Sequence, residues 1–244
     1  MAKEYPIQNV SFRGETDNFL TEASGGSELP KWVNDTAISV NAERVYDQLE
    51  LFSELFSDAN RTMPVLTEIT LNKKATAKSH RPAVRKMMDV NSKRNVLGVT
   101  SVGKILVKID TANDLKKMER GFKVVNTANL PKDKKIGLSA IENISRYKAV
   151  VDDSIQENDR LKLQLVDYLN SEYNHRSRIA LSIKCKEFGV ELEELNYASS
   201  LRLFSLEHVS EEALQAIASM DCVLAVRKMP TIEFETAPDE DNSS

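Results

Sequence analysis

One order of hydrophobic patterns occurs twice along this 244-residue chain and constrains its fold more than any other feature. In residues 62–125, apolar and polar side chains alternate in "MPVLTEITL", take helical spacing in "RPAVRKMMDV" and alternate again, twice, in "NVLGVTSVGKILVKID". Helical spacing returns at Leu115, Met118 and Phe122. These periods predict the element order β-α-β-β-α.

The same order returns about 96 residues further along the chain. "LKLQLVDYL" predicts a strand, and the helix that follows is expected to end at Gly189, because glycine favours the C-terminal cap. A hairpin and a helix capped by Ser210 come next. "CVLAVRKMPTIEFE" predicts a final strand, which is clear only in this second copy.

The repeated order predicts an α+β protein made of two tandem ferredoxin-like modules of the β-α-β-β-α-β type. Each module is expected to be an antiparallel sheet with helices on one face, which leaves the other face for a partner. The expected organisation is an N-terminal arm and amphipathic helix at 1–61, the first module at 62–125, a linker with a short helix at 126–159, the second module at 160–236, and an acidic tail at 237–244.

An amphipathic helix is expected before the first module. Apolar residues recur at helical spacing between Val45 and Phe56, and Asn41 is a candidate N-cap. The helix is expected to end near Asn60, and the arm before it shows no period.

Charge is distributed unevenly, although the formal net charge is only −4. Residues 231–244 contain acids and no basic residue, whereas residues 71–94 contain many basic residues and the single acid Asp89. The second segment supplies a candidate basic docking surface, which consists of Lys73, Lys74, Lys78, His80, Arg81, Arg85 and Lys86.

Three interpretations of the basic segment stay open. It could neutralise the phosphates of a nucleic acid, dock an acidic protein such as an ATPase, or be a solvated face. RNA-binding domains of similar shape stack bases on exposed aromatic residues of their central strands, and the candidate strands here offer only Phe204.

The two cysteines, Cys185 and Cys222, lie at apolar positions of predicted elements. The N-terminus has no secretory signal, and no apolar run approaches the roughly 20 residues that a membrane span requires. We therefore expect a cytoplasmic protein with buried free thiols.

Motifs for catalysis, metals and cofactors are absent from the sequence. His80, His175 and His208 lie outside any CxxC, HxxxH or HExxH spacing, and we expect His175 and His208 to be surface or capping residues. Gly-rich phosphate loops and a GxSxG elbow are also missing. We expect no metal, no cofactor and no catalysis by this chain alone.

The segment from Leu161 to Glu235 resembles the propeptide of subtilisin-like serine proteases. The resemblance rests on "YASSLRLFSL", on the helix start "SEEALQAI" and on the outgoing strand "CVLAVRKMPTIEFE". In that family a β-α-β-β-α-β domain lays its sheet on two surface helices of the protease, and its extended C-terminal end enters the active-site cleft. The resemblance implies a non-catalytic inhibitor and folding assistant.

A second resemblance concerns the first module. "PVLTEITLNKKATAKSHRP" and "NVLGVTSVGKILVKIDTANDLKKM" resemble the N-terminal region of bacterial intracellular subtilases that occur beside an AAA-type ATPase; "AKSHRP" is the most specific fragment. The implied partners are a protease domain, in the same or a separate chain, and the ATPase. No protease triad motif precedes Ser244, so we expect either an N-terminal portion of a protease or a separate inhibitor.

The resemblance implies that the protease binds a C-terminal ribbon, which consists of Pro230, Thr231, Ile232, Glu233, Phe234, Glu235 and Thr236. Pro230 fixes its own φ and biases Met229 away from helix, so the ribbon is expected to be extended. Ile232 and Phe234 would then fill pockets as alternate side chains. In a second interpretation they are the last core residues of the sheet.

Overall fold

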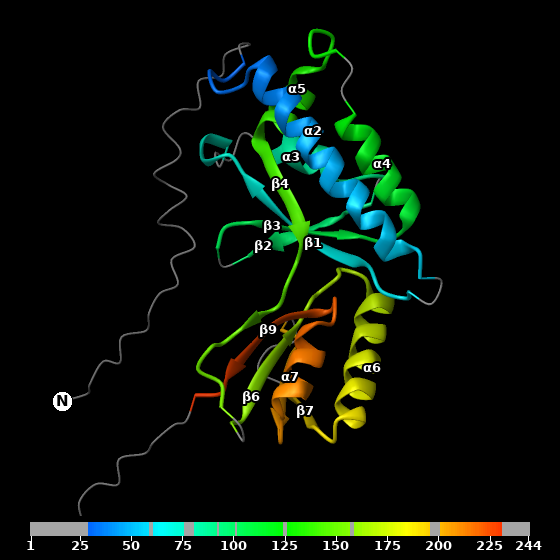
Figure 1. Cartoon of the computed structure of the whole chain (residues 1–244), viewed down its shortest axis with the longest axis vertical. Coiled ribbons are helices and arrows are strands. Elements are labelled where there is room, and N and C mark those ends of the chain that lie inside the picture. Colours follow the sequence, from blue (N-terminus) through cyan, green and yellow to red (C-terminus); the bar gives the residue numbers. More distant parts are fainter. Residues whose placement is uncertain are drawn as a thin grey trace, which may run out of the picture. The chain divides into compact units, whose positions relative to one another are not determined.

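The computed structural model describes residues 29–58, 61–75, 81–91, 93–100, 102–123, 126–156, 159–195 and 201–230. The chain divides into two compact units, Met1–Tyr147 and Lys148–Ser244. Each combines helices with a sheet, so the protein is α+β as expected (Figure 1). Among the described residues, no helix has both the length and the apolar character needed to cross a bilayer.

The first unit contains a four-stranded antiparallel sheet in the order β2-β3-β1-β4. Its strands are β1 (Val65–Leu71), β2 (Val96–Val99), β3 (Ile105–Ile109) and β4 (Ile141–Arg146). β1 lies between β3 and β4, with Thr67 opposite Val107 and Ile69 opposite Ile144. The strand predicted from the alternation in "MPVLTEITL" is therefore confirmed as a central strand.

Helices of the first unit share one hydrophobic core with the sheet. They are α2 (Asp35–Leu51), α3 (Arg81–Met88), α4 (Ala112–Phe122) and α5 (Lys132–Ala140), with the short 3₁₀ helices η2 (Phe52–Phe56) and η3 (Lys73–Ala75). All four α-helices bury side chains against residues of β1, β3 and β4. The predicted stripe of Leu115, Met118 and Phe122 on α4 is buried in this core, and Thr111 caps that helix.

Helices α3 and α5 pack closely because Gly137 of α5 has no side chain. A Cβ there would lie 2.6 Å from Cγ of Met87 and 3.1 Å from the carbonyl oxygen of Ala83. We expect Gly137→Ala to lower the free energy of unfolding of the first unit by about 1–3 kcal/mol through overpacking, measured by urea denaturation.

Gly121 of α4 provides the matched control for Gly137. A Cβ at Gly121 meets no heavy atom closer than Cε of Met87 at 3.7 Å, which is ordinary contact. We expect Gly121→Ala to be neutral or to stabilise the helix by up to about 1 kcal/mol, because alanine has the higher helix propensity. Equal losses for the two variants would contradict the close packing of α3 and α5.

The expected linker at 126–159 is wrong, because α5 and β4 complete the first unit and β4 pairs along β1. The sequence did not predict β4, because its apolar residues do not alternate with polar ones. Ile141 and Ile144 are three residues apart, yet both are buried in the core. The register shifts between Thr70 and Leu71, and a bulge of this kind lets two residues at odd separation face the same side.

Helix α2 begins earlier than expected and belongs to the first unit rather than to a separate arm. Its N-cap is Asn34, whose side chain accepts a 2.8 Å hydrogen bond from the N–H of Ala37. Asn41, the expected cap, is buried inside the helix. Its side-chain amide donates to the carbonyl oxygens of Leu138 and Ser139, which joins α2 to α5.

The second unit contains a five-stranded sheet in the order β5-β9-β6-β8-β7. Its elements are β5 (Val150–Val151), β6 (Leu161–Leu165), α6 (Ser171–Glu187), β7 (Glu191–Leu195), β8 (Leu203–Glu207), α7 (Glu211–Ala218) and β9 (Val223–Lys228). β5 pairs with β9 in parallel, and the other pairs are antiparallel. The four longer strands follow the order β9-β6-β8-β7, which repeats the order β4-β1-β3-β2 of the first unit.

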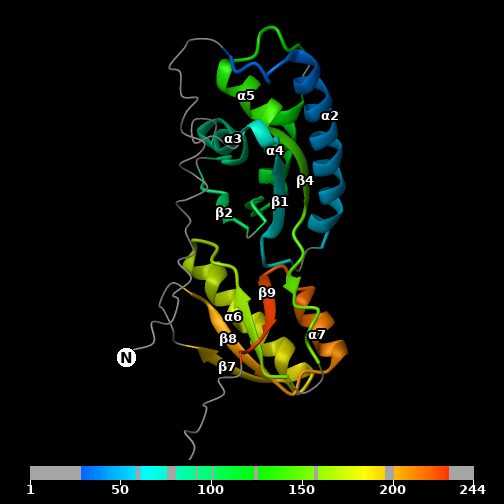
Figure 2. The same cartoon turned by 90° about the vertical axis from the view of Figure 1, so that its left-hand side faces the viewer.

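Side chains of β6 and β8 alternate between the two faces of the second sheet. Leu161 lies opposite Leu206 and Leu163 opposite Phe204, and all four are buried. Helices α6 and α7 contact each other and bury Leu181, Cys185, Ala213 and Ile217 (Figure 1 and Figure 2). We call the face opposite this core the open face; its residues are Lys162, Gln164, Glu191, Glu193, Leu195, Leu203, Ser205, Glu207, Ala225 and Arg227. Of these, Leu203, Ser205 and Ala225 are buried, whereas Glu191, Glu193 and Arg227 are exposed.

Candidate functional site

The open face has one row of mostly apolar side chains across its strands, and the rows beside it contain charged side chains. Leu195 lies opposite Leu203, and Gln164 lies between Leu203 and Ala225 in the ladder of β8, β6 and β9. Basic residues lie toward β9 and acidic residues toward β7. A face of this composition can bind a protein through its exposed charged side chains, with one apolar row beside them.

Arg160, immediately before β6, contacts acidic residues of both β7 and β8. Its Nε donates to Oγ of Ser205 at 2.9 Å and pairs with Oε1 of Glu207 at 2.8 Å. A terminal nitrogen of the same guanidinium donates to Oε2 of Glu193 at 3.0 Å. One cation thus contacts two carboxylates on two strands, β7 and β8.

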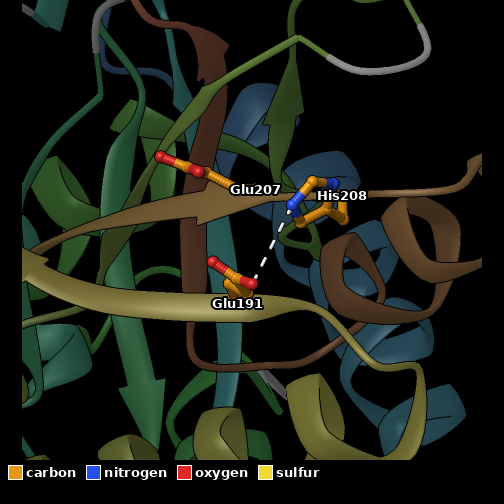
Figure 3. Close-up of side chains that lie close together, drawn as sticks. All are labelled: Glu191, Glu207 and His208. Atoms are coloured by element: carbon orange, nitrogen blue, oxygen red, sulfur yellow. Dashed lines mark ion pairs between the residues drawn. The ribbon is translucent and has the colours of Figure 1, made fainter.

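A cluster of two carboxylates and one imidazole lies next to Arg160, at the end of the β7–β8 ladder. Glu191 and Glu207 occupy directly opposite positions in that ladder, and His208 follows Glu207. Nε2 of His208 lies 3.9 Å from Oε1 of Glu191, and one potential ligand atom from each residue lies within 4.8 Å of the others. Figure 3 shows the imidazole of His208 and the carboxylate of Glu191 facing each other across the two strands.

The backbone of His208 explains how this side chain reaches Glu191. Consecutive side chains of a strand point to opposite faces, so an imidazole directly after Glu207 would point away from the open face. His208 instead has φ +59°, in the left-handed region, which ends the strand and redirects the side chain. Its exposure agrees with the expected surface histidine, but the sequence did not reveal its proximity to Glu191 and Glu207.

The structure describes five of the seven residues of the candidate basic docking surface. Lys73 and Lys74 lie in η3, and Arg81, Arg85 and Lys86 lie in α3; all five are exposed. Lys78 and His80 lie outside the described residues. Two of the cations have acidic neighbours, since Arg85 pairs with Asp89 at 2.8 Å and Lys86 with Asp133 at 3.1 Å.

Phe204, the aromatic residue that the candidate strands offered for base stacking, is 2% exposed and faces the core. Stacking on a base requires an exposed ring. The second sheet therefore does not present Phe204 as a platform for nucleic acid.

Of the C-terminal ribbon, the structure describes only Pro230, which is exposed. Thr231, Ile232, Glu233, Phe234, Glu235 and Thr236 lie outside the described residues. The chain just before the ribbon is fixed, because the N–H of Met229 donates to the carbonyl oxygen of Arg160 at 2.8 Å. Lys228 also pairs with Asp159 at 2.9 Å. The ribbon thus starts from a point anchored beside β6.

Both cysteines are free and buried, as the sequence predicted. Burial raises the pKa of Cys185 to about 11 and that of Cys222 to about 12. Thiols with such pKa values carry little thiolate at neutral pH, so neither cysteine has the properties of a nucleophile.

Comparisons of this chain with protein-family models, with curated proteins and with solved structures gave no match.

Proposed function

We propose that this chain is a non-catalytic, propeptide-like module that inhibits a subtilisin-like serine protease and assists its folding. In this proposal the two units are tandem ferredoxin-like modules. The observation that supports it most directly is the second unit, whose β-α-β-β-α-β order gives a sheet with one open face and a last strand, β9, that leads to Pro230.

The open face is the proposed docking surface for helices of the protease. Its exposed charged side chains can pair with a bound helix and set its orientation. The C-terminal ribbon then lies in the active-site cleft, where its backbone adds hydrogen bonds to exposed strands of the protease and alternate side chains enter pockets. Because Met229 and Lys228 are anchored, part of the ordering cost is removed before binding.

The first unit is proposed to add a second docking surface, through the exposed cations of η3 and α3, for the protease or for an AAA-type ATPase. Arg85 and Lys86 are exposed although they form salt bridges with Asp89 and Asp133. Salt bridges of exposed cations are weak enough for the cations to exchange partners. We do not propose a nucleic-acid ligand, because Phe204 is buried.

The test measures peptide hydrolysis by a purified intracellular-type subtilisin-like protease while the full chain is added. We expect inhibition at stoichiometric amounts. Deletion of residues 231–244 is expected to weaken inhibition at least tenfold, because the ribbon supplies the contacts in the cleft. Equal inhibition by the full-length and shortened chains would overturn the cleft-binding role.

Two charge reversals in the second unit separate docking from nonspecific charge effects. Arg227 lies on the open face, whereas Lys186 is an exposed residue of α6 on the other side of the sheet. We expect Arg227→Glu to weaken inhibition and Lys186→Glu to leave it unchanged. The same effect from both variants would contradict docking through the open face.

A further inference from the structure

The pairing of β7 with β8 brings two like charges together. Glu191 and Glu207 are directly opposite across this antiparallel ladder, an arrangement that destabilises a sheet when nothing neutralises it. Arg160 pairs with Glu207 of β8 and with Glu193 of β7. Within the described part of the chain, the ion-pair partner of Glu191 is His208, which is charged only when protonated.

The charges of this cluster do not balance without a further cation. The guanidinium of Arg160 contacts two carboxylates, Glu193 and Glu207, and a third carboxylate, Glu191, lies opposite Glu207. Three negative charges and one positive charge leave a net charge of −2 when His208 is neutral. A single divalent cation would bring this group to neutrality.

The donor atoms indicate which class of divalent cation fits. An imidazole nitrogen with carboxylate oxygens suits first-row transition ions such as Zn²⁺, whereas Mg²⁺ and Ca²⁺ prefer oxygen ligands alone. Ligand atoms bound to one Zn²⁺ at about 2.1 Å lie at most about 4.2 Å apart. The donors of Glu191, Glu207 and His208 lie within 4.8 Å, and Glu191 and His208 are on exposed side chains that can rotate to close this difference.

The surroundings already hold one of these ligands in place. Arg160 binds Oε1 of Glu207, which leaves the second oxygen of that carboxylate for an ion. Arg160 is itself held by Ser205 and Glu193. Hydrogen bonds of this kind to a ligating carboxylate are typical of metal centres, where they orient the ligand.

We propose that Glu191, Glu207 and His208 bind a divalent first-row transition-metal ion at the β7–β8 edge of the open face. Three protein ligands leave at least one coordination position for water or for a group of a partner protein. The site lies apart from the C-terminal ribbon, and its metal titration needs no protease, so its test is separate from that of the proposed function.

The test is isothermal titration calorimetry of the full chain with ZnCl₂ at neutral pH. We expect one equivalent of Zn²⁺ to bind, and His208→Ala and Glu191→Gln each to weaken this binding at least tenfold, because each removes a ligand atom. His175→Ala is the matched control, since His175 is an exposed histidine of α6 in the same unit. This variant is expected to bind as the unchanged chain does.

Circular dichroism of each variant tests whether it is still folded, so that removal of a ligand atom can be distinguished from unfolding. Because the substituted residues are exposed, we expect unchanged spectra. Broadening of the amide signals of Glu191, Glu207 and His208 by Co²⁺ in nuclear magnetic resonance spectra would support the same location. Absence of Zn²⁺ binding to the unchanged chain would overturn the proposal. Binding that His208→Ala leaves unaltered, or that His175→Ala removes, would overturn it as well.

Discussion

Replacing Phe122 with alanine is expected to lower the free energy of unfolding of the first unit by about 3–5 kcal/mol. Phe122 is 1% exposed and belongs to the core that α2, α3, α4 and α5 form with the sheet. Removing its ring leaves a cavity between helices and strands of this core. These elements hold one another in place, so they cannot easily move to fill the cavity. Urea denaturation followed by the fluorescence of Trp32, the single tryptophan, measures the loss, because Trp32 packs against the same core.

Leu51→Ala is the control for this experiment. Leu51 ends α2 and is 72% exposed, so its truncation removes little buried surface and is expected to change stability by less than about 0.5 kcal/mol. A loss below about 1 kcal/mol for Phe122→Ala would show that Phe122 does not pack in the core as described.

Asp114→Ala is expected to destabilise the first unit by about 2–4 kcal/mol. The carboxylate of Asp114 is buried and accepts hydrogen bonds from the hydroxyl of Thr111 at 2.9 Å, from Asn91 and from Lys93 at 3.4 Å. The N–H of Asp114 in turn donates to Oγ1 of Thr111, the N-cap of α4. The substitution keeps this backbone hydrogen bond but leaves the buried side-chain partners of the carboxylate unpaired.

The contribution of Asp114 to stability is expected to decrease in acid. Burial raises the pKa of Asp114, but hydrogen bonds from Thr111 and Asn91 and the charge of Lys93 outweigh it and hold the pKa below its ordinary value of 3.8. The stabilisation is therefore fully present above the ordinary value and is lost as the pH falls through the folded-state value. We expect the stability difference between the unchanged chain and Asp114→Ala to be constant near neutral pH and to shrink in acid.

Asp133→Ala is the matched control, because Asp133 pairs with Lys86 at an exposed position. Exposed pairs contribute about 0–1 kcal/mol, so a small change without a steep dependence on acid pH is expected. If Asp133→Ala and Asp114→Ala cost the same, the buried hydrogen bonds of Asp114 do not contribute as argued.

Elements whose burial follows one clean period could be predicted from the sequence. β6 is a central strand in which buried Leu161, Leu163 and Leu165 alternate with half-buried residues, which makes the period of two visible. Helix α7 begins at the side-chain cap Ser210, as predicted. Caps and one-sided burial can be recognised in the sequence, because each requires certain residue types at certain spacings.

Elements that depend on distant partners were missed or misplaced. β4 did not show a period of two, because a bulge against β1 places Ile141 and Ile144 on the same face. Asn41 resembled a cap, although its amide bonds to carbonyl groups of α5 almost 100 residues away. Both errors have the same cause: the side-chain pattern was set by a contact that the local sequence does not contain.

The candidate metal cluster was missed for a related reason. Glu207 and His208 are adjacent in sequence, but Glu191 joins them only through the register of β7 with β8. No ligand spacing within one segment marks such a site, and the left-handed backbone of His208 is not evident from its neighbours. A search for acidic residues at opposing positions of a predicted hairpin, followed by a histidine at its end, could have found it.

The sequence by itself determined the class of the protein, the repeated order of strands and helices, the cap Ser210 and the burial of both cysteines, because these follow from local periods and local hydrogen bonds. Only the tertiary structure decided that α2, α5 and β4 complete the first unit, and that one sheet edge collects Glu191, Glu207 and His208. Strand register and helix packing bring together residues far apart in the chain, and they are fixed by the sum of many contacts rather than by any one segment.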